Sequence, residues 1–129
     1  MRKPINILDS LEIVDGICRV RPVGESTLVE AVDLISRVIS YCRERKIAKL
    51  MVNGTGLVGI PIPNLVDRFL MAEEWAQKAQ SMVIVVLVVH AEYIHPEKFG
   101  VKVARDLGLM LDVYTSEDEA LKWLASATA

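Results

Sequence analysis

No apolar run in this chain is long enough to span a membrane. The longest uninterrupted run is Met82–Val89, which has eight residues, whereas a membrane-spanning helix needs about 20. An export signal is also lacking, because Asp9 follows the polar segment Met1–Asn6 before an apolar stretch develops. These two absences predict a cytoplasmic protein without a membrane span.

Cysteine and excess positive charge are both scarce. The two cysteines, Cys18 and Cys42, have no C-x-x-C partner and no histidine nearby, so we expect reduced thiols in the core. The chain has 15 Lys and Arg against 17 Asp and Glu, which gives a net charge of −2. Domains that bind nucleic acids normally carry a basic excess, so a nucleic acid is not an expected partner.

Apolar residues, in contrast, are plentiful. They make up 52% of the 129 positions, which allows a packed core and argues against disorder. The length suits one domain and leaves little room for a second core. No repeat, linker or low-complexity stretch divides the chain. We therefore expect residues 1–129 to form a single domain.

The N-terminal region carries a hairpin signal. Asp15 and Gly16 separate the apolar residues Val14 and Ile17. An Asp-Gly pair favours a two-residue hairpin turn because both residues tolerate positive φ. The pattern predicts one strand that ends near Val14 and a second strand from Ile17 to about Val23.

The second of these strands alternates in polarity. Arg19 and Arg21 share one face, while Cys18 and Val20 share the other. With Pro22 close to its end, the pattern is typical of an outer strand that has one solvated face. The two arginines could hold an anion, but a charged sheet edge explains them more simply.

Helix and strand signals then alternate to the C-terminus. Thr27 and Glu30 form a capping box, and so do Ser116 and Glu119. The second helix repeats apolar residues at helical spacing, which predicts that they face the core: Leu65, Phe69, Ala72, Ala76 and Ala79. Helices are expected to begin near Thr27, Pro63–Asn64, Pro96 and Ser116, and strands are expected at Ala48–Val52, Met82–Val89 and Leu109–Tyr114.

This order predicts an α/β fold with a mainly parallel central sheet and an N-terminal hairpin strand. Counted from the second strand, four successive βα units follow one another, and such units form right-handed crossovers. The run Met82–Val89 shows no alternation. It is therefore expected to be a central strand that helices cover on both faces.

Three stretches of the sequence resemble the SpoIIAA-like fold of STAS domains, the anti-sigma-factor antagonists and their relatives, which is structurally related to the CRAL-TRIO lipid-binding domain. They are Gly24–Thr27, which leads into the first helix, the strand Lys49–Val52, and the tail Val113–Leu124 with its strand, acidic capping box and helix. The resemblance covers nearly the whole chain from Leu11 onward. It implies a regulatory module that acts through protein contacts.

One feature of phosphoregulated STAS antagonists is missing from this sequence. They carry a serine or threonine at the start of the helix that follows the strand corresponding to Ala48–Val52. Here the segment Gly59–Leu65 contains no hydroxyl group, and Thr55 lies too early in the loop. We therefore do not expect the phosphorylation switch in this chain.

The segment Gly54–Gly59 matches the pattern G-x-G-x-x-G. In a dinucleotide site that pattern opens a helix, whose N-terminus binds the pyrophosphate. Here Pro61 and Pro63 intervene, and each disfavours a helical residue before it. A flexible, irregular loop is the simpler interpretation. Because it leaves the C-terminal end of a strand, it is the candidate ligand- or partner-binding loop, with Asn53, Gly54, Thr55, Gly56 and Gly59 as its candidate residues.

His90, Glu92, His95 and Glu97 follow the strand Met82–Val89. A metal site needs at least three converging ligands, and this spacing extends across a strand end and a loop, so no metal is expected. His90 remains a candidate ligand-facing residue, since open α/β sheets bind ligands at this edge. The segments Gly54–Ile60 and His90–His95 should be neighbours there.

No catalytic residue and no cofactor are expected. Thr55 and Ser26 lack a recognisable base and orienting acid. The leading hypothesis is a non-enzymatic regulatory or protein-interaction module that acts through the Asn53–Pro63 loop. The alternative is a protein that binds a small apolar or nucleotide-like ligand in a cleft between this loop and His90–His95. A homodimer is left open.

Overall fold

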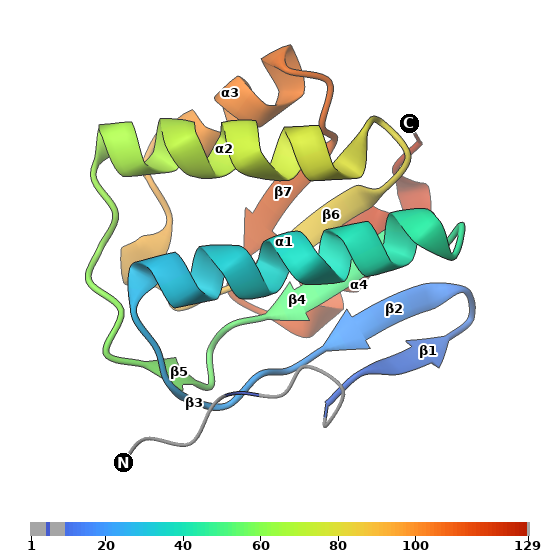
Figure 1. Ribbon diagram of the computed structural model, residues 1–129, viewed down its shortest axis with the longest axis horizontal. Coiled ribbons are helices and arrows are strands. Elements are labelled where there is room, and N and C mark those ends of the chain that lie inside the picture. The colour runs from blue at the N-terminus through green and yellow to red at the C-terminus, as the bar shows by residue number, and fades with distance from the viewer. Residues whose placement is uncertain (1–4, 6–9, 129) are drawn as a thin grey trace.

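The computed structural model describes residue 5 and residues 10–128. Its main sheet has five strands in the order β1-β2-β4-β6-β7. The first pair is antiparallel, and all the other neighbours are parallel (Figure 1). The strands are β1 (Glu12–Val14), β2 (Ile17–Val20), β4 (Lys49–Asn53), β6 (Ile84–Val88) and β7 (Leu111–Tyr114). The predicted α/β fold, with its hairpin and mainly parallel sheet, is confirmed.

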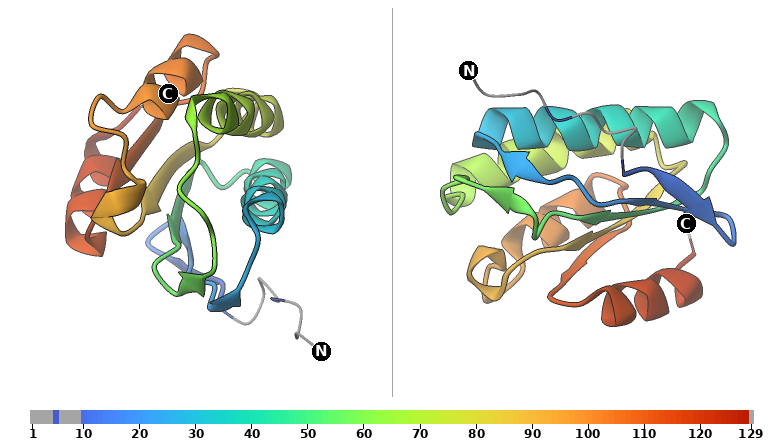
Figure 2. Two further views of the ribbon diagram at one scale, coloured as in Figure 1. Left: turned by 90° about the vertical axis from the view of Figure 1, so that its left-hand side faces the viewer. Right: turned by 90° about the horizontal axis from the view of Figure 1, so that it is seen from below.

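Four helices cover this sheet. They are α1 (Leu28–Glu44), α2 (Leu65–Ala79), α3 (Phe99–Asp106) and α4 (Glu117–Ser126). Helices α1 and α2 lie over one face with α3 beside α2, and α4 lies alone on the opposite face (Figure 2). Each of β2, β4, β6 and β7 is followed by one helix, so the four predicted βα units are present. No helix in the described residues has the length and apolarity required to cross a membrane.

The core has one apolar cluster on each face of the sheet. Leu50 and Val85 point toward α1 and α2, whereas Met51 and Val86 point toward α4. All four side chains are fully buried. This two-sided burial explains why the strand around Val85 and Val86 shows no polar alternation.

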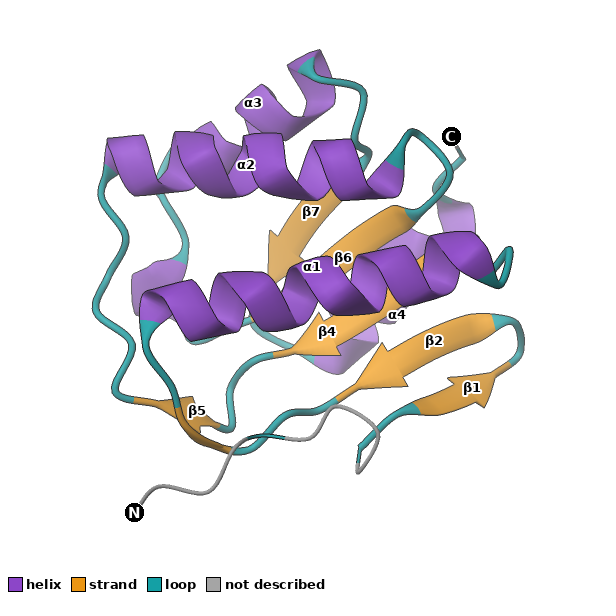
Figure 3. Cartoon of the chain, viewed as in Figure 1, coloured by secondary structure: helices purple, strands orange, loops and turns teal. Residues whose placement is uncertain are grey.

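A second, two-stranded sheet was not predicted. β3 (Gly24–Glu25) pairs in parallel with β5 (Leu57–Val58), which lies inside the segment expected to be an irregular loop (Figure 3). Backbone hydrogen bonds from the N–H groups of Gly24 and Ser26 flank this pair. The prediction of an irregular loop is therefore wrong for its middle part.

The predicted outer position of the second strand is also wrong. β2 ends at Val20, and it lies between β1 and β4 because the short strand β1 occupies the edge. Arg21, just past its end, forms an ion pair with Glu117. It is therefore not part of a solvated edge.

The buried face of α2 differs from the predicted stripe. Ala72, Trp75 and Ala79 are buried, whereas Leu65 and Phe69 are 51% and 42% exposed. The Trp75 indole N–H donates a hydrogen bond to the Val32 carbonyl of α1 (3.2 Å). This contact fixes the side of α2 that faces α1, and it leaves Leu65 and Phe69 on a neighbouring stripe.

The third helix begins later than predicted. Pro96 lies in a turn that the Lys98 N–H closes on the His95 carbonyl (2.8 Å), and α3 starts at Phe99. A short 3₁₀ helix, η2 (Ala91–Tyr93), precedes the turn. Gly108, with φ of 91°, follows the C-terminus of α3 as expected.

Candidate functional site

The segments that leave the C-terminal ends of the parallel strands are joined by polar side chains. Asn53, the last residue of β4, donates its amide N–H to Glu117 Oε2 (2.7 Å). Its amide oxygen accepts hydrogen bonds from the backbone N–H (3.0 Å) and the hydroxyl (2.7 Å) of Thr55. The polar atoms of these two predicted site residues are therefore already engaged within the chain.

Arg21 binds the same glutamate from the other side. Its guanidinium donates two hydrogen bonds to Glu117, at 2.7 Å and 2.9 Å, and a third to Glu12 at 2.8 Å. The hydrogen bonds from Arg21 and Asn53 hold the pKa of Glu117 below its ordinary value, although burial opposes this shift. Glu117 therefore links the ends of β2 and β4 to the start of α4.

Glu117 should make the protein more sensitive to acid. A carboxylate whose pKa is lowered by folding stabilises the protein above its unfolded-state pKa, and this stability is lost as the pH falls through the folded-state pKa. The side chains of Arg21 and Glu117 are 38% and 26% exposed, so solvent screens the pair. We expect Glu117→Gln to reduce the unfolding free energy by about 0.5–1 kcal/mol at pH 7. The loss should shrink as the pH falls through the lowered pKa of Glu117, because the native carboxyl group then becomes protonated. Urea denaturation at pH 7 and pH 3.5 measures the loss of unfolding free energy at neutral pH and its decrease in acid.

Asp118→Asn is the matched control for this experiment. Asp118 lies next to Glu117 in the first turn of α4, so it experiences the same helix dipole. It is exposed, and within the described residues the hydrogen bonds of Arg21 and Asn53 go to Glu117 and not to Asp118. A pH-dependent loss of equal size in both variants would mean that the helix dipole, and not the Arg21 pair, is responsible.

The glycines of the Gly54–Gly59 segment serve the packing of the chain. A Cβ on Gly56 would lie 2.9 Å from the Pro22 carbonyl oxygen. Gly59 has φ of 89°, a conformation that other residues rarely adopt. Helix α2 starts only at Leu65, and the side chains of Asn64 and Asp67 cap its N-terminus. The motif therefore does not present a helix N-terminus to a phosphate, as the two prolines predicted.

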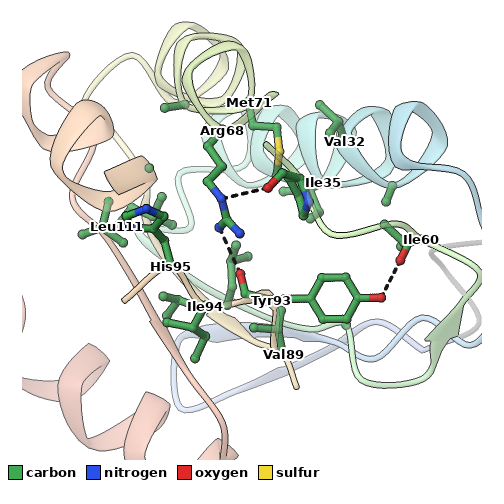
Figure 4. Close-up of a pocket in the computed structure, with 18 of the residues that line it drawn as sticks. Val32, Ile35, Ile60, Arg68, Met71, Val89, Tyr93, Ile94, His95 and Leu111 are labelled. Carbon is green, nitrogen blue, oxygen red and sulfur yellow. Dashed lines mark hydrogen bonds between the residues drawn. The ribbon is translucent and has the colours of Figure 1, made fainter. Parts of the chain in front are cut away.

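The two segments expected to be neighbours do lie side by side. The His90 ring nitrogen Nε2 is 3.1 Å from the Thr55 carbonyl oxygen. The Tyr93 hydroxyl donates a hydrogen bond to the Ile60 carbonyl (Figure 4). These contacts and helices α1, α2 and α3 surround a cavity that is partly open to solvent.

The volume of this cavity is about 150 Å³. It lies at the C-terminal edge of the sheet, where the sequence predicted a cleft. Most of its lining side chains are apolar and come from α1, α2, β6, β7, α3 and both loops. Gly54 and His90 are the predicted site residues that line it, and apolar members of the lining include Val32, Ile35, Ile60, Met71, Val89, Ile94 and Leu111.

Arg68 is the cavity residue that sequence reasoning missed. It projects from α2 toward Tyr93 and Ile94 (Figure 4). Its Nε–H donates to the Pro63 carbonyl (3.2 Å) and its Nη1–H donates to the Tyr93 carbonyl (3.0 Å). Burial lowers the pKa of the guanidinium, which nevertheless stays charged at neutral pH. The signal was present in the sequence, since Arg68 has helical spacing with Ala72, Trp75 and Ala79.

The histidines after β6 are engaged separately. His90 contacts Thr55, and His95 Nδ1 accepts a hydrogen bond from the Glu97 backbone N–H (3.1 Å). Within residue 5 and residues 10–128, no three His, Cys, Asp or Glu side chains are grouped so that they could bind a metal ion.

A solved structure has the same arrangement of strands and helices. It is the crystal structure of an anti-sigma factor antagonist from Mycobacterium paratuberculosis, which matches with a TM-score of 0.61 over 98% of this chain and 100% of that chain. This chain has the anti-sigma factor antagonist fold. The predicted SpoIIAA-like architecture is thus confirmed, while the sequence identity is 16%. No protein-family model and no curated protein matches the sequence.

Within this SpoIIAA-like fold, the cavity and the polar links share the edge at which the strands end. The polar links hold that edge together through Asn53, Thr55, Arg21 and Glu117. The cavity has an apolar lining and an arginine at its side. The cavity and the polar links therefore lie at the edge of the sheet where the candidate loop was predicted.

Proposed function

We propose that this chain is a non-enzymatic regulatory module that acts by binding another protein. The structural neighbour is an anti-sigma factor antagonist, which supports a regulatory role. The observation that carries the proposal is a set of exposed apolar side chains on β5, on the loop between β5 and α2, and on the first two turns of α2. We call this set the α2 patch; it consists of Val58, Ile62, Leu65, Val66, Phe69 and Leu70.

The α2 patch has the composition of a docking surface. The exposed fractions of its side chains lie between 42% (Phe69) and 66% (Val66). Apolar groups that are gathered in this way on a protein surface commonly mark interaction sites. The patch includes Val58 and Ile62 of the predicted partner-binding loop Asn53–Pro63. It supports a partner that presents an apolar segment to α2.

A photo-crosslinking amino acid at Phe69 tests this proposal. In cells of the natural host it should form a crosslink to one protein, whereas the same group at the exposed Lys122 on α4 should not. The crosslinked protein, once identified and purified, should bind the Phe69→Ala chain at least about tenfold more weakly than the original chain, because aromatic anchors dominate interface energies. Lys122→Ala should leave the binding constant unchanged.

Stability measurements separate binding from folding in this test. Val66 is 66% exposed and Phe69 is 42% exposed, so Val66→Ser should change the unfolding free energy by no more than about 0.5 kcal/mol and Phe69→Ala should lower it by only about 1 kcal/mol. Equal crosslinking at Phe69 and Lys122 would contradict the proposal. A crosslink to a second copy of the chain would mean that the α2 patch is a homodimer interface instead.

The proposal has three further parts. We propose that it performs no catalysis, supported by the hydroxyls of Thr55 and Ser26, which donate to Asn53 Oδ1 and the Thr27 carbonyl and not to a base. We also propose a cytoplasmic location and no nucleic-acid partner. The free, buried thiols of Cys18 and Cys42 support the location, and the net charge of −2 supports the second point.

The cavity favours small-ligand binding as a second candidate function. It lies between the Asn53–Pro63 loop and the segment His90–His95, and its lining is mostly apolar. Apolar pockets with a few polar groups at strand ends are common ligand sites in α/β proteins. A ligand there would contact both segments, and this contact would allow it to influence the neighbouring α2 patch.

A further inference from the structure

Every ionisable side chain that lines the cavity is either basic or a phenol. Arg68, His90, His95, Lys98 and Tyr93 line it, and none of the lining residues in the described chain is Asp or Glu. A bound molecule would therefore meet positive charge and no negative charge in this lining.

The charges of these residues are not equally available. Lys98 forms an ion pair with Asp112 at 2.7 Å, so its charge is already balanced. The two histidines make hydrogen bonds to backbone groups. Arg68 differs, because its hydrogen-bond acceptors are the neutral carbonyls of Pro63 and Tyr93. Among residue 5 and residues 10–128, no carboxylate forms an ion pair with it.

A partly buried guanidinium without a counter-ion gains free energy when an anion arrives. The two carbonyls hold Nε and Nη1 of Arg68, and Nη2 makes no hydrogen bond in the described chain. Arginine pairs well with carboxylates because its planar N–H groups match the two oxygens. A negative group beside Arg68 would offset the desolvation that lowers the arginine's pKa.

The volume limits the rest of the ligand. A dry apolar cavity of about 150 Å³ holds a molecule of roughly the size of benzene, with about six carbon atoms. The cavity described here has the same volume, so its interior suits a short aromatic or branched body.

We propose that the cavity binds a small apolar carboxylic acid, with its body between α1, α2 and β6 and its carboxylate on Arg68. This inference rests on the second candidate function, the binding of a small ligand, and adds the ligand class to it. It does not depend on the α2 patch.

Phenylacetate and its neutral isostere phenylacetamide are the probes that test this inference. In an NMR titration, phenylacetate should cause saturable shifts of the Tyr93 and Val101 amides and of the Arg68 Nε–H. It should bind at least about tenfold more tightly than phenylacetamide, since a hydrogen-bonded charge pair is worth about this much.

Variants of Arg68 give the second comparison. Arg68→Gln should weaken phenylacetate binding about tenfold and leave phenylacetamide binding unchanged. Arg37→Gln, on the exposed side of α1, is the matched control and should change neither. The probe comparison in the original chain remains decisive if Arg68→Gln disturbs the loop, because it needs no substitution.

The possible outcomes distinguish a failure of this inference from a failure of small-ligand binding itself. Equal binding of the acid and the amide would overturn the role of Arg68 and keep ligand binding as a function. Absence of any shift from either probe up to about 10 mM would remove the inference and its second candidate function together. Shifts centred on Arg19 and Arg21 would place the anion site at the C-terminal end of β2, outside the cavity.

Discussion

Replacing Trp75 with alanine should lower the free energy of unfolding by about 3–5 kcal/mol, the range for removing a buried aromatic side chain. The side chain is 2% exposed and packs into the cluster that joins α1 and α2 to the sheet. Its indole N–H also donates to the Val32 carbonyl of α1. The substitution thus removes apolar contacts and a hydrogen bond between two helices, and urea denaturation measures the loss.

Trp123→Ala provides the comparison for this prediction. Trp123 lies on α4 and is only partly buried against the other cluster. The same chemical change should therefore cost less, because less apolar area is removed from the interior. Equal losses in the two variants would show that burial of the ring does not control the cost.

Gly56→Ala should destabilise the protein by about 1–3 kcal/mol, the usual cost of forcing extra atoms into packed structure. The added Cβ would lie 2.9 Å from the Pro22 carbonyl oxygen and 3.0 Å from Val23 Cγ2. Because the first of these is a backbone atom, the segment that leads into β3 would have to move away from β5. Urea denaturation and hydrogen exchange at Gly24 and Ser26 would report the change.

Gly54→Ala is the control within the same motif. Its Cβ would meet the nearest atom, the Val88 carbonyl oxygen, at 3.7 Å, and its φ is not in the positive range. We expect a change of no more than about 0.5 kcal/mol. If both variants lost the same stability, close packing against Pro22 would not explain Gly56.

Local sequence signals were sufficient for most of the fold. The Asp15-Gly16 pair gave the hairpin, with φ of 53° and 78° as its turn requires. The capping residues at Thr27 and Ser116 marked true helix starts. These features depend on residues that are close together in the sequence, so they can be predicted from the sequence alone.

The parts that could not be predicted depend on residues far apart in the chain. The pairing of Gly24 with Leu57 joins two short segments that have no strand pattern of their own. Glu117 was recognised as part of a capping segment, but its contact with Arg21 extends across 96 positions. The topology placed Gly54–Ile60 beside His90–His95 correctly. The cavity between them depends on how side chains from several elements pack against one another, and local sequence patterns do not determine this packing.

The position of α4 has a consequence for folding during synthesis. This helix follows all the strands in the chain, and it is the element whose buried residues Ala120 and Leu124 cover Met51 and Val86. Chains made on the ribosome begin to fold from the N-terminal side. Helices α1 and α2 can therefore dock on their face of the sheet while the opposite face still lies bare. Until Ser116 and the residues after it leave the ribosome, the nascent chain exposes the apolar face of the sheet that carries Met51 and Val86. During this interval the exposed face is prone to aggregation, and a chaperone could protect it.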